Sequence, residues 1–274
     1  MPHRTIHDIF KRGSKTYFYN TLFFPRRVKE DVFVLYSFVR KADNFVDSVP
    51  QQADEFHALR AAHARAMAGE ATGDVVIDSF ADLSRRKSFP PEWTEAFLAS
   101  MEMDLHKRTY ADMAEVDRYI YGSAEVIGLY MSSILGLPAA SHPFARSLGK
   151  AMQYINFIRD INEDLALGRT YFPRSDFERF GLDDLTPEEA VAKPDEFAAF
   201  VRAQIARYDA WQVEAEAGFA HIPRRLRIPI RNASEMYRWT ANRIRRDPHV
   251  VHRVKVKPSV TRIVATMGRT VLTG

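Results

Sequence analysis

The sequence predicts an all-α fold, and three observations support that prediction. Apolar residues recur at i, i+3 and i+4 along most of the 274 residues, which is the spacing of one helix face. Strand-like alternation of apolar and polar residues is confined to 250–256. No glycine-rich turn follows a predicted strand, so we do not expect a nucleotide-binding α/β fold. A chain of this length can bury a large core, and we expect a single domain spanning residues 1–274.

Helix breakers separate the expected helices in chain order. Pro25 and Pro50 lie on either side of the first long helix, and glycines or prolines end the later ones. Small residues such as Gly122 and Gly128 interrupt one apolar helix, where they allow close approach of another helix or of a substrate. The segment 168–187 contains Pro173, Gly181 and Pro187 and is predicted to be a loop. The expected helices are 29–46, 53–69, 74–83, 91–110, 116–135, 145–165, 197–220 and 231–246.

Composition excludes several classes of protein. Cysteine is absent, which excludes a disulfide framework, a thiolate metal site and a cysteine nucleophile. The first residues lack the apolar core of a signal peptide, and no apolar run reaches the length of a membrane span. We expect a cytoplasmic protein, with peripheral contact to the inner face of the membrane as an open alternative.

Basic residues concentrate near the C-terminus, although the formal net charge is only +4. Such a stretch could attract nucleic acid, anionic lipid or a phosphorylated substrate, or could form a solvated surface. Only Glu235 and Asp247 oppose it. The stretch contains twelve cationic residues: Arg224, Arg225, Arg227, Arg231, Arg238, Arg243, Arg245, Arg246, Arg253, Lys255, Lys257 and Arg262.

Two predicted helices carry the same acidic pattern. Asp43 and Asp47 are four residues apart in the helix 29–46, and Asp160 and Asp164 are four apart in the helix 145–165. Asn156 lies one turn before the second pair. Residues four apart share one helix face, so each pair should form a column of oxygen-bearing side chains.

These acidic columns predict a cation site. A solvated helix face explains one pair, but two pairs inside apolar runs are harder to place on the surface. Adjacent carboxylates repel one another, so positive charge is expected beside them. Carboxylate oxygens suit hard cations, and Mg²⁺ uses one or two carboxylates together with substrate phosphates. We therefore expect two facing acidic helices to hold Mg²⁺, or Mn²⁺ as an alternative, against a diphosphate.

The two Asp-x-x-x-Asp motifs resemble the aspartate-rich motifs of the squalene/phytoene synthase family, and the resemblance extends from about Ser14 to the region of Tyr237. It implies a single-domain isoprenoid-synthase-type helical bundle with a central apolar cavity. One departure is Asn44, which stands where the family often has a second aspartate and to which we assign no metal role. The matching flanks are Ser14-Lys15-Thr16-Tyr17-Phe18, Tyr36-x-x-x-Arg40, Tyr119-x-Tyr121-Gly122 with Gly128, and Gly168-Arg169-Thr170-Tyr171-Phe172-Pro173.

The same resemblance implies a role for individual residues. Tyr36 and Arg40 join the four aspartates as the expected catalytic set, while Arg159 is expected to point away from the acids in a structural role. The implied metal ligands are Asp43, Asp47, Asn156, Asp160 and Asp164. The implied diphosphate and substrate contacts are Ser14, Lys15, Tyr17, Tyr36, Arg40, Tyr119, Gln153, Asn156 and Tyr237.

The resemblance further implies a reaction, the head-to-head condensation of two prenyl diphosphates through a cyclopropylcarbinyl diphosphate. Two geranylgeranyl diphosphates would give phytoene, for carotenoid biosynthesis, and the sequence is most similar to prokaryotic phytoene-synthase-type members. Two farnesyl diphosphates would give squalene or dehydrosqualene, and NADPH would be needed only for squalene. A different class, a non-catalytic helical protein that binds nucleic acid or membrane, would explain the basic stretch but not the acids. We therefore expect prenyl diphosphate partners and no nucleic acid.

Overall fold

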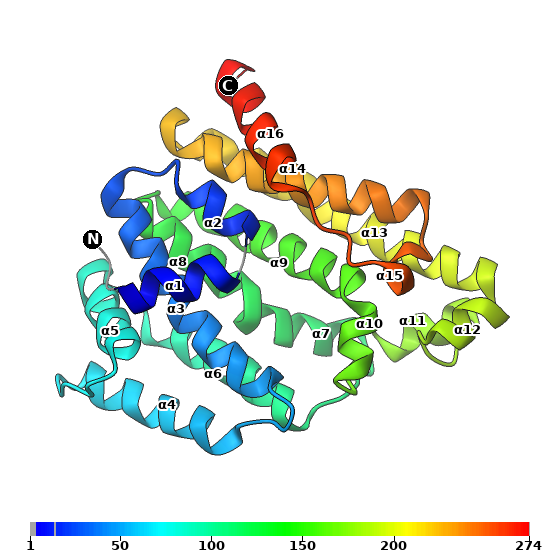
Figure 1. The fold of residues 1–274 in the computed structure, drawn as a ribbon, viewed down its shortest axis with the longest axis horizontal. Coiled ribbons are helices and arrows are strands. Elements are labelled where there is room, and N and C mark those ends of the chain that lie inside the picture. The colour runs from blue at the N-terminus through cyan, green and yellow to red at the C-terminus, as the bar shows by residue number, and fades with distance from the viewer. Residues whose placement is uncertain (1–3, 14, 274) are drawn as a thin grey trace.

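The computed structural model describes residues 4–13 and 15–273, and helices account for its architecture (Figure 1). Within these residues no strand forms, and the sole bridge of strand type joins Tyr110 and Pro173. The helices are α1 Arg4–Gly13, α2 Lys15–Thr21, α3 Arg26–Asp47, α4 Ala53–Met67, α5 Val75–Lys87, α6 Pro91–His106, α7 Met113–Ile120, η1 Tyr121–Glu125, α8 Val126–Ile134, η2 Ala139–Ser141, α9 His142–Arg159, α10 Ile161–Ala166, α11 Arg174–Phe180, α12 Pro187–Ala192, α13 Pro194–Ala217, η3 Gly218–His221, α14 Arg224–Arg246, α15 Val250–Arg253 and α16 Val260–Thr273.

The predicted all-α fold is confirmed, and the structure differs from the sequence pattern in three places. The segment 168–187 is not a loop throughout, because Pro173 caps the start of α11 and Gly181 ends it in the left-handed conformation. The alternating segment 250–256 forms α15 and then an extended stretch, since it has no neighbouring strand to pair with among the described residues. The last predicted helix begins earlier, at Arg224, and accommodates Pro229 inside it.

Two apolar clusters form the core. The first gathers side chains of α1, α3, α4, α5, α6 and α8, and the second gathers side chains of α7, α9, α13 and α14 with the segment that follows α10. In Figure 1 α3 and α9 run through the middle of the molecule, between the N-terminal helices and the C-terminal ones. The two helices that carry the acidic motifs therefore stand in separate clusters. None of the helices of the described chain is long and apolar enough to cross a membrane.

Two glycines set the spacing of α9 against α8 and η1. A Cβ on Gly128 would lie 2.0 Å from the carbonyl oxygen of Ala145, and one on Gly149 would lie 2.3 Å from that of Ala124. No side chain fits at either distance, so Gly128 brings α8 against α9 and Gly149 brings α9 against η1. Both glycines also line the cavity described below, so the packing role and the substrate-wall position predicted for Gly128 coincide.

Candidate active site

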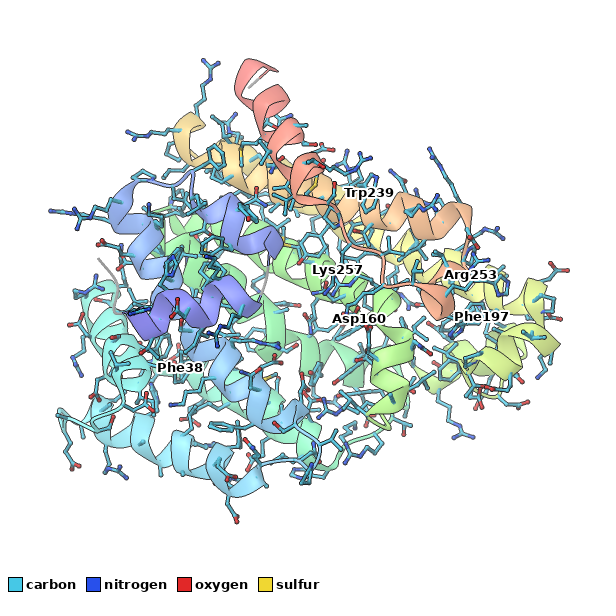
Figure 2. The ribbon with its side chains drawn as sticks, viewed as in Figure 1. Phe38, Asp160, Phe197, Trp239, Arg253 and Lys257 are labelled. Atoms are coloured by element: carbon cyan, nitrogen blue, oxygen red, sulfur yellow. The ribbon has the colours of Figure 1, made fainter. Side chains whose placement is uncertain are left out.

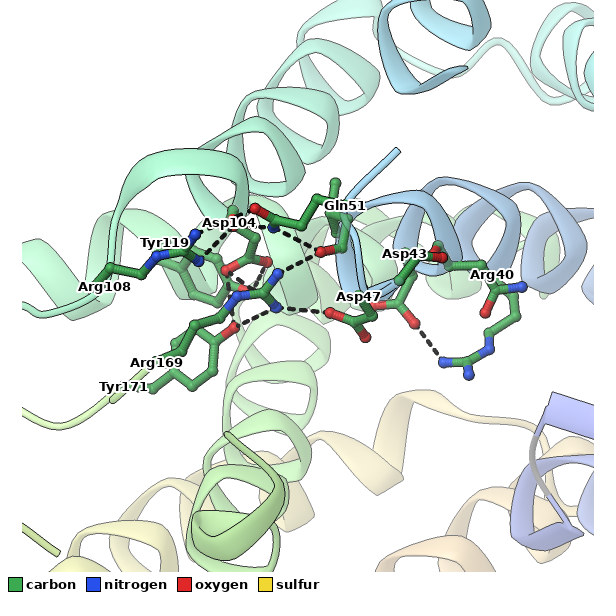
Figure 3. Close-up of polar contacts among 12 residues, drawn as sticks. Arg40, Asp43, Asp47, Gln51, Asp104, Arg108, Tyr119, Arg169 and Tyr171 are labelled. Carbon is green, nitrogen blue, oxygen red and sulfur yellow. Dashed lines mark hydrogen bonds and ion pairs between the residues drawn. The ribbon is translucent and has the colours of Figure 1, made fainter. Parts of the chain in front are cut away.

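Helix α3 presents the first acidic pair. The helix is unbroken from Arg26 to Asp47, so Asp43 and Asp47 lie one turn apart on one side of it. Arg40, three residues before Asp43, donates a hydrogen bond to Asp43 Oδ2 (Figure 3). Tyr36 lies one turn further back and lines the cavity. The predicted face of Tyr36, Arg40, Asp43 and Asp47 is therefore formed by one helix.

Positive charge does not fully compensate Asp43. Burial, with the neighbouring carboxylate of Asp47, raises the pKa of Asp43 to about 7, against the opposing effect of Arg40. A cation that binds beside such a carboxyl stabilises its ionised form. Repulsion between the two aspartates thus favours binding of a cation here, as the acidic pattern predicts.

Arg169 ties the first pair to the segment after α10. Its side chain is only 3% exposed, and its Nη1 donates to Asp47 Oδ1 over 2.6 Å. Its Nη2 donates to the carbonyl oxygen of Val46 over 2.5 Å. One guanidinium therefore holds the last turn of α3 at two points (Figure 3).

A buried acid, Asp104 on α6, completes this cluster. It accepts hydrogen bonds from the hydroxyl of Tyr119 over 2.7 Å and from that of Tyr171 over 2.8 Å. Burial raises the pKa of Asp104 to about 6, although Arg169 and the two tyrosines act in the opposite direction. Figure 3 shows Asp104, Tyr119, Tyr171 and Arg169 gathered beside Asp47.

Sequence reasoning missed the Asp104–Arg169 cluster. Arg169 and Tyr171 stand in the segment that resembles the family, but no role was assigned to them. Asp104 lies in a run of acidic and basic residues that is typical of a solvated helix end. Its apolar flanks, Met101 and Leu105, were the available signal that Asp104 faces inward.

The second acidic pair lies across a break in the helix rather than on a continuous one. Helix α9 ends at Arg159 and α10 begins at Ile161, with Asp160 between them. Its φ of −100° and ψ of 14° depart from helical values. The amide nitrogen of Asp164 still donates to the Asp160 carbonyl over 2.9 Å, so the two residues remain one turn apart.

Arg159 does not point away from the acids, and that prediction is wrong. Its Nε donates to Asp160 Oδ1 over 2.8 Å, because the helix break turns the two neighbouring side chains toward each other. Lys255, on the extended segment before α16, adds an ion pair with Asp160 over 2.9 Å and another with Glu163 over 2.9 Å. Figure 2 shows Asp160 facing the segment that carries Lys257.

These cations give the two aspartates of the second pair pKa shifts in opposite directions. Burial raises the pKa of Asp160, but hydrogen bonds from Arg159 and Lys255 outweigh burial and leave that pKa below its ordinary value. Burial, together with the charges of Asp160 and Asp47, raises the pKa of Asp164 to about 8. The two pairs therefore influence each other electrostatically.

An apolar cavity of about 290 Å³ comes within one helical turn of the two pairs, although none of the four aspartates lines it. Tyr36 and Val39 line it from α3, and Gln153 and Asn156 line it from α9. Its other walls come mostly from apolar and small side chains of α8, α9 and α14 and of the segments that join the helices. The predicted central apolar cavity is therefore present, and Val39 and Asn156, each four residues before an aspartate, mark its end nearest the carboxylates.

Asn156 is placed as a ligand would be. Its Oδ1 is buried and accepts no hydrogen bond from any described residue. A buried acceptor without a donor is costly unless a cation or a donor from a ligand reaches it. Asn156 lies one turn before Asp160 in sequence and on the cavity wall, so the orphaned oxygen lies beside the acids.

The remaining predicted site residues divide into three groups. Ser14 lies outside the described residues, and so do the side chains of Lys15 and Tyr17. Tyr237 is buried and raises the pKa of Tyr36, after burial and Asp43, so the two tyrosines are close. Tyr119 is engaged by Asp104 and is not among the residues that line the cavity.

The donor chemistry of the site suits a hard divalent cation. Within the part of the chain that the structure describes, no three Asp, Glu, His or Cys side chains converge as ligands of one ion. The carboxylates come instead as two pairs, beside the orphaned oxygen of Asn156. Mg²⁺ commonly takes one or two carboxylates and completes its shell with water and phosphate oxygens, so pairs of oxygen ligands are sufficient.

Comparisons with known proteins agree with this arrangement. A family model described as squalene/phytoene synthase matches residues 10–262. A 15-cis-phytoene synthase from Paracoccus sp. is 25% identical over 273 residues, which cover 95% of this chain and 88% of that protein. A 15-cis-phytoene synthase from Pantoea ananas is 27% identical over 243 residues, covering 82% of this chain and 77% of that protein.

Solved structures share the fold. The squalene synthase HpnC from Alicyclobacillus acidocaldarius superposes with a TM-score of 0.79 at 25% identity, covering 88% of this chain and 92% of that one. A dehydrosqualene synthase in complex with a ligand gives a TM-score of 0.81 at 24% identity, covering 97% of this chain and 94% of that one. The predicted isoprenoid-synthase-type bundle is therefore confirmed.

Proposed function

The chain belongs to the squalene/phytoene synthase family, and we propose that it is a Mg²⁺-dependent prenyltransferase that joins two geranylgeranyl diphosphates head to head into phytoene. The observation that carries this proposal is that the two acidic pairs follow, by one helical turn, the residues Val39 and Asn156 that line one end of an apolar cavity. The acids suit the cations that accompany a diphosphate, and the cavity suits a prenyl chain. The curated relatives named 15-cis-phytoene synthase support the choice of product.

The chain's own residues would bind and orient the diphosphates. Asp43, Asp47, Asp160 and Asp164, with Asn156, would hold Mg²⁺, which supplies neutralisation of the charge that develops on a departing diphosphate. Basic side chains at the same end of the cavity would also neutralise charge on the departing diphosphate. Arg40 and Arg159 each contact an aspartate of the site and are placed to donate to phosphate oxygens. Positive groups aimed at the developing charge lower the barrier to ionisation.

The apolar cavity would protect the cation that remains. Breaking the donor's C1–O bond releases diphosphate and leaves an allylic cation, which water would quench. The double bond of the acceptor then bonds to that C1, and loss of a proton closes a cyclopropane ring. A second ionisation, rearrangement and loss of a proton give the linear hydrocarbon. Tyr36 and Tyr237 stand at the polar end, where aromatic faces stabilise a desolvated cation by about 2 kcal/mol each.

A second candidate reaction uses the shorter substrate. Two farnesyl diphosphates would give dehydrosqualene, or squalene if NADPH delivers a hydride to the final cation. The fold match to the squalene synthase HpnC favours this alternative. Both reactions share the acidic pairs and the cavity, and they differ in how much chain the cavity must accept.

One experiment separates the two substrates. Purified protein is incubated with each diphosphate and Mg²⁺, with and without NADPH, and the hydrocarbon is identified by mass spectrometry. We expect phytoene from geranylgeranyl diphosphate, no requirement for NADPH, and loss of product when EDTA removes the metal. A product from farnesyl diphosphate alone would select the second reaction. No hydrocarbon from either substrate would overturn the proposed function.

A further inference from the structure

The third wall of the cavity begins at a serine. Helices α3 and α9 each supply one wall, and η1 together with α8 supplies another, whose first lining residue is Ser123. On this wall Gly128 meets Ala145 of α9. Four residues earlier Ala124 meets Gly149, which is four residues further along α9, so the two elements run in opposite directions. Ser123 therefore lies beside the part of α9 that leads to the second acidic pair.

Ser123 also follows the buried cluster beside the first pair in the chain. Four residues before it, the hydroxyl of Tyr119 donates to Asp104 over 2.7 Å (Figure 3). Asp104 lies 4.0 Å from the guanidinium of Arg169, which holds Asp47. The lining of this wall thus begins about one turn after residues of that cluster, just as the lining on α3 and α9 ends one turn before the aspartates. Ser123 therefore marks the same end of the cavity on the third wall.

A π-helical turn presents Ser123 to the cavity. In η1 the N–H of Val126 donates to the carbonyl oxygen of Tyr121, which is the wider pattern of a π-helix. Helix α9 contacts this turn at Gly149, and α6 packs against it as well. Single π turns inside α-helical segments occur frequently at functional sites. The backbone of Ser123 is therefore held in place by two neighbouring helices, which favours a well-defined contact with a ligand.

The hydroxyl of Ser123 has no hydrogen-bond partner in the described part of the chain, although its oxygen is buried. Among the described residues that line the cavity, the buried side-chain atoms in this condition are Ser123 Oγ and Asn156 Oδ1. A buried polar group without a partner costs free energy unless a ligand supplies one. The amide oxygen can only accept, so it suits a cation, whereas the hydroxyl can donate, so it suits an anion. A diphosphate bound with Mg²⁺ supplies both partners.

The prenyl chain cannot be the partner of this hydroxyl. It consists of carbon and hydrogen, so the oxygen atoms of a prenyl diphosphate all belong to its diphosphate. A water molecule could accept the hydrogen bond, but water beside the reacting carbon would quench the cation. The acceptor that suits Ser123 at this end of the cavity is therefore a phosphate oxygen.

We propose that the Ser123 hydroxyl donates a hydrogen bond to a phosphate oxygen of a bound prenyl diphosphate. This inference deepens the proposed function and rests on it. When the C1–O bond breaks, its electron pair leaves with the diphosphate, so the charge on the phosphate oxygens rises and the hydrogen bond strengthens. Ser123 keeps its proton throughout, and it stabilises the leaving group without adding a charge to the cavity.

Binding of an unreactive geranylgeranyl thiolodiphosphate with Mg²⁺, measured by calorimetry, tests this contact without turnover. Ser123→Thr and Ser123→Val give side chains of the same shape that differ in the hydroxyl. We expect the Kd to be at least about tenfold higher for Ser123→Val than for Ser123→Thr, and for Ser123→Ala than for the wild type. The matched control is Ser133→Ala, on α8 but outside the cavity lining, which should bind like the wild type.

Two further readouts separate this contact from a role in shaping the cavity wall. Diphosphate bound with Mg²⁺ but without a prenyl chain should lose affinity by a similar factor in Ser123→Val, which a change in the apolar wall would not cause. In turnover, kcat should also be about tenfold lower for Ser123→Val than for Ser123→Thr, because the hydrogen bond is stronger in the transition state. Thermal unfolding of each variant checks that the fold is kept.

The outcomes distinguish this contact from the proposed reaction. Equal Kd values for Ser123→Val and Ser123→Thr, with hydrocarbon still formed, would overturn the contact and leave the reaction standing. A chain that forms no hydrocarbon from any prenyl diphosphate but keeps the difference in Kd would refute the reaction and leave the contact standing. If Ser123→Val fails to fold, the comparison of Ser123→Ala with the wild type decides in the same way.

Discussion

The two acidic pairs have the same spacing in the sequence but different support in the structure. Asp43 and Asp47 stand on a continuous helix, and Asp47 is held by a buried guanidinium from a residue 122 positions later. Asp160 and Asp164 stand across a helix break, and Asp160 is balanced by the adjacent Arg159 and by Lys255. The first pair is thus held by one buried guanidinium, and the second by two partly accessible cations, one adjacent in sequence and one on the extended segment before α16.

The two pairs should therefore respond differently when the cations beside them are removed. Arg169 and Asp104 are both buried, so loss of Arg169 leaves the Asp104 carboxyl without a compensating charge in the interior. Arg159 and Lys255 are more accessible, so their loss changes the local field with little effect on the fold. We therefore expect variants around the first pair to alter both stability and turnover, and variants around the second to alter turnover alone.

Removal of one carboxylate from either pair should have the largest effect. We predict that Asp43→Asn and Asp160→Asn each lower turnover by about 1000-fold, because each removes a carboxylate that would hold the cation needed to neutralise the departing diphosphate. Asp54→Asn, on the exposed face of α4, is the matched control. Steady-state assay and thermal unfolding distinguish lost chemistry from lost fold. Near-normal turnover in both variants would contradict the assignment of the site.

Substitution of the arginine that contacts each pair should affect stability at the first pair only. We predict that Arg169→Lys lowers the free energy of unfolding by about 2 kcal/mol and lowers turnover about tenfold, since an ammonium cannot reach Asp47 and the Val46 carbonyl together. Arg159→Lys should lower turnover by a similar factor and leave unfolding unchanged. Denaturant unfolding of the two variants beside the wild type provides the measurement. Equal destabilisation by both would remove the distinction between the pairs.

The titration of Asp104, the buried acid next to the first pair, should make the stability of the protein depend on pH. The pKa of Asp104 is raised to about 6, so its contribution to stability is fully present below the unfolded value near 3.8 and is lost as pH rises through 6. Asp104→Asn removes this titration. We predict that the wild type loses up to about 3 kcal/mol relative to Asp104→Asn between pH 4 and 7. A constant difference across that interval would mean that Asp104 titrates normally.

Sequence patterns were sufficient where a feature is local. The helical periodicity of 29–46 and the spacing of Asp43 and Asp47 predicted α3 and its acidic face, because both depend on residues within a few turns. The break at Asp160 was not predictable in this way, since no proline or glycine marks it. The contacts of Asp104 with Tyr119 and Tyr171 depend on how α6, α7 and the segment after α10 meet.

Crystals grown with Mn²⁺ and an unreactive prenyl thiolodiphosphate would show whether the two acidic pairs bind cations together. The anomalous signal of Mn²⁺ reports where each cation lies. We predict cations held between the pairs, with ligands from both α3 and the α9–α10 junction and the prenyl chain in the cavity. Cations bound by one pair alone, or a prenyl chain bound outside the cavity, would contradict it.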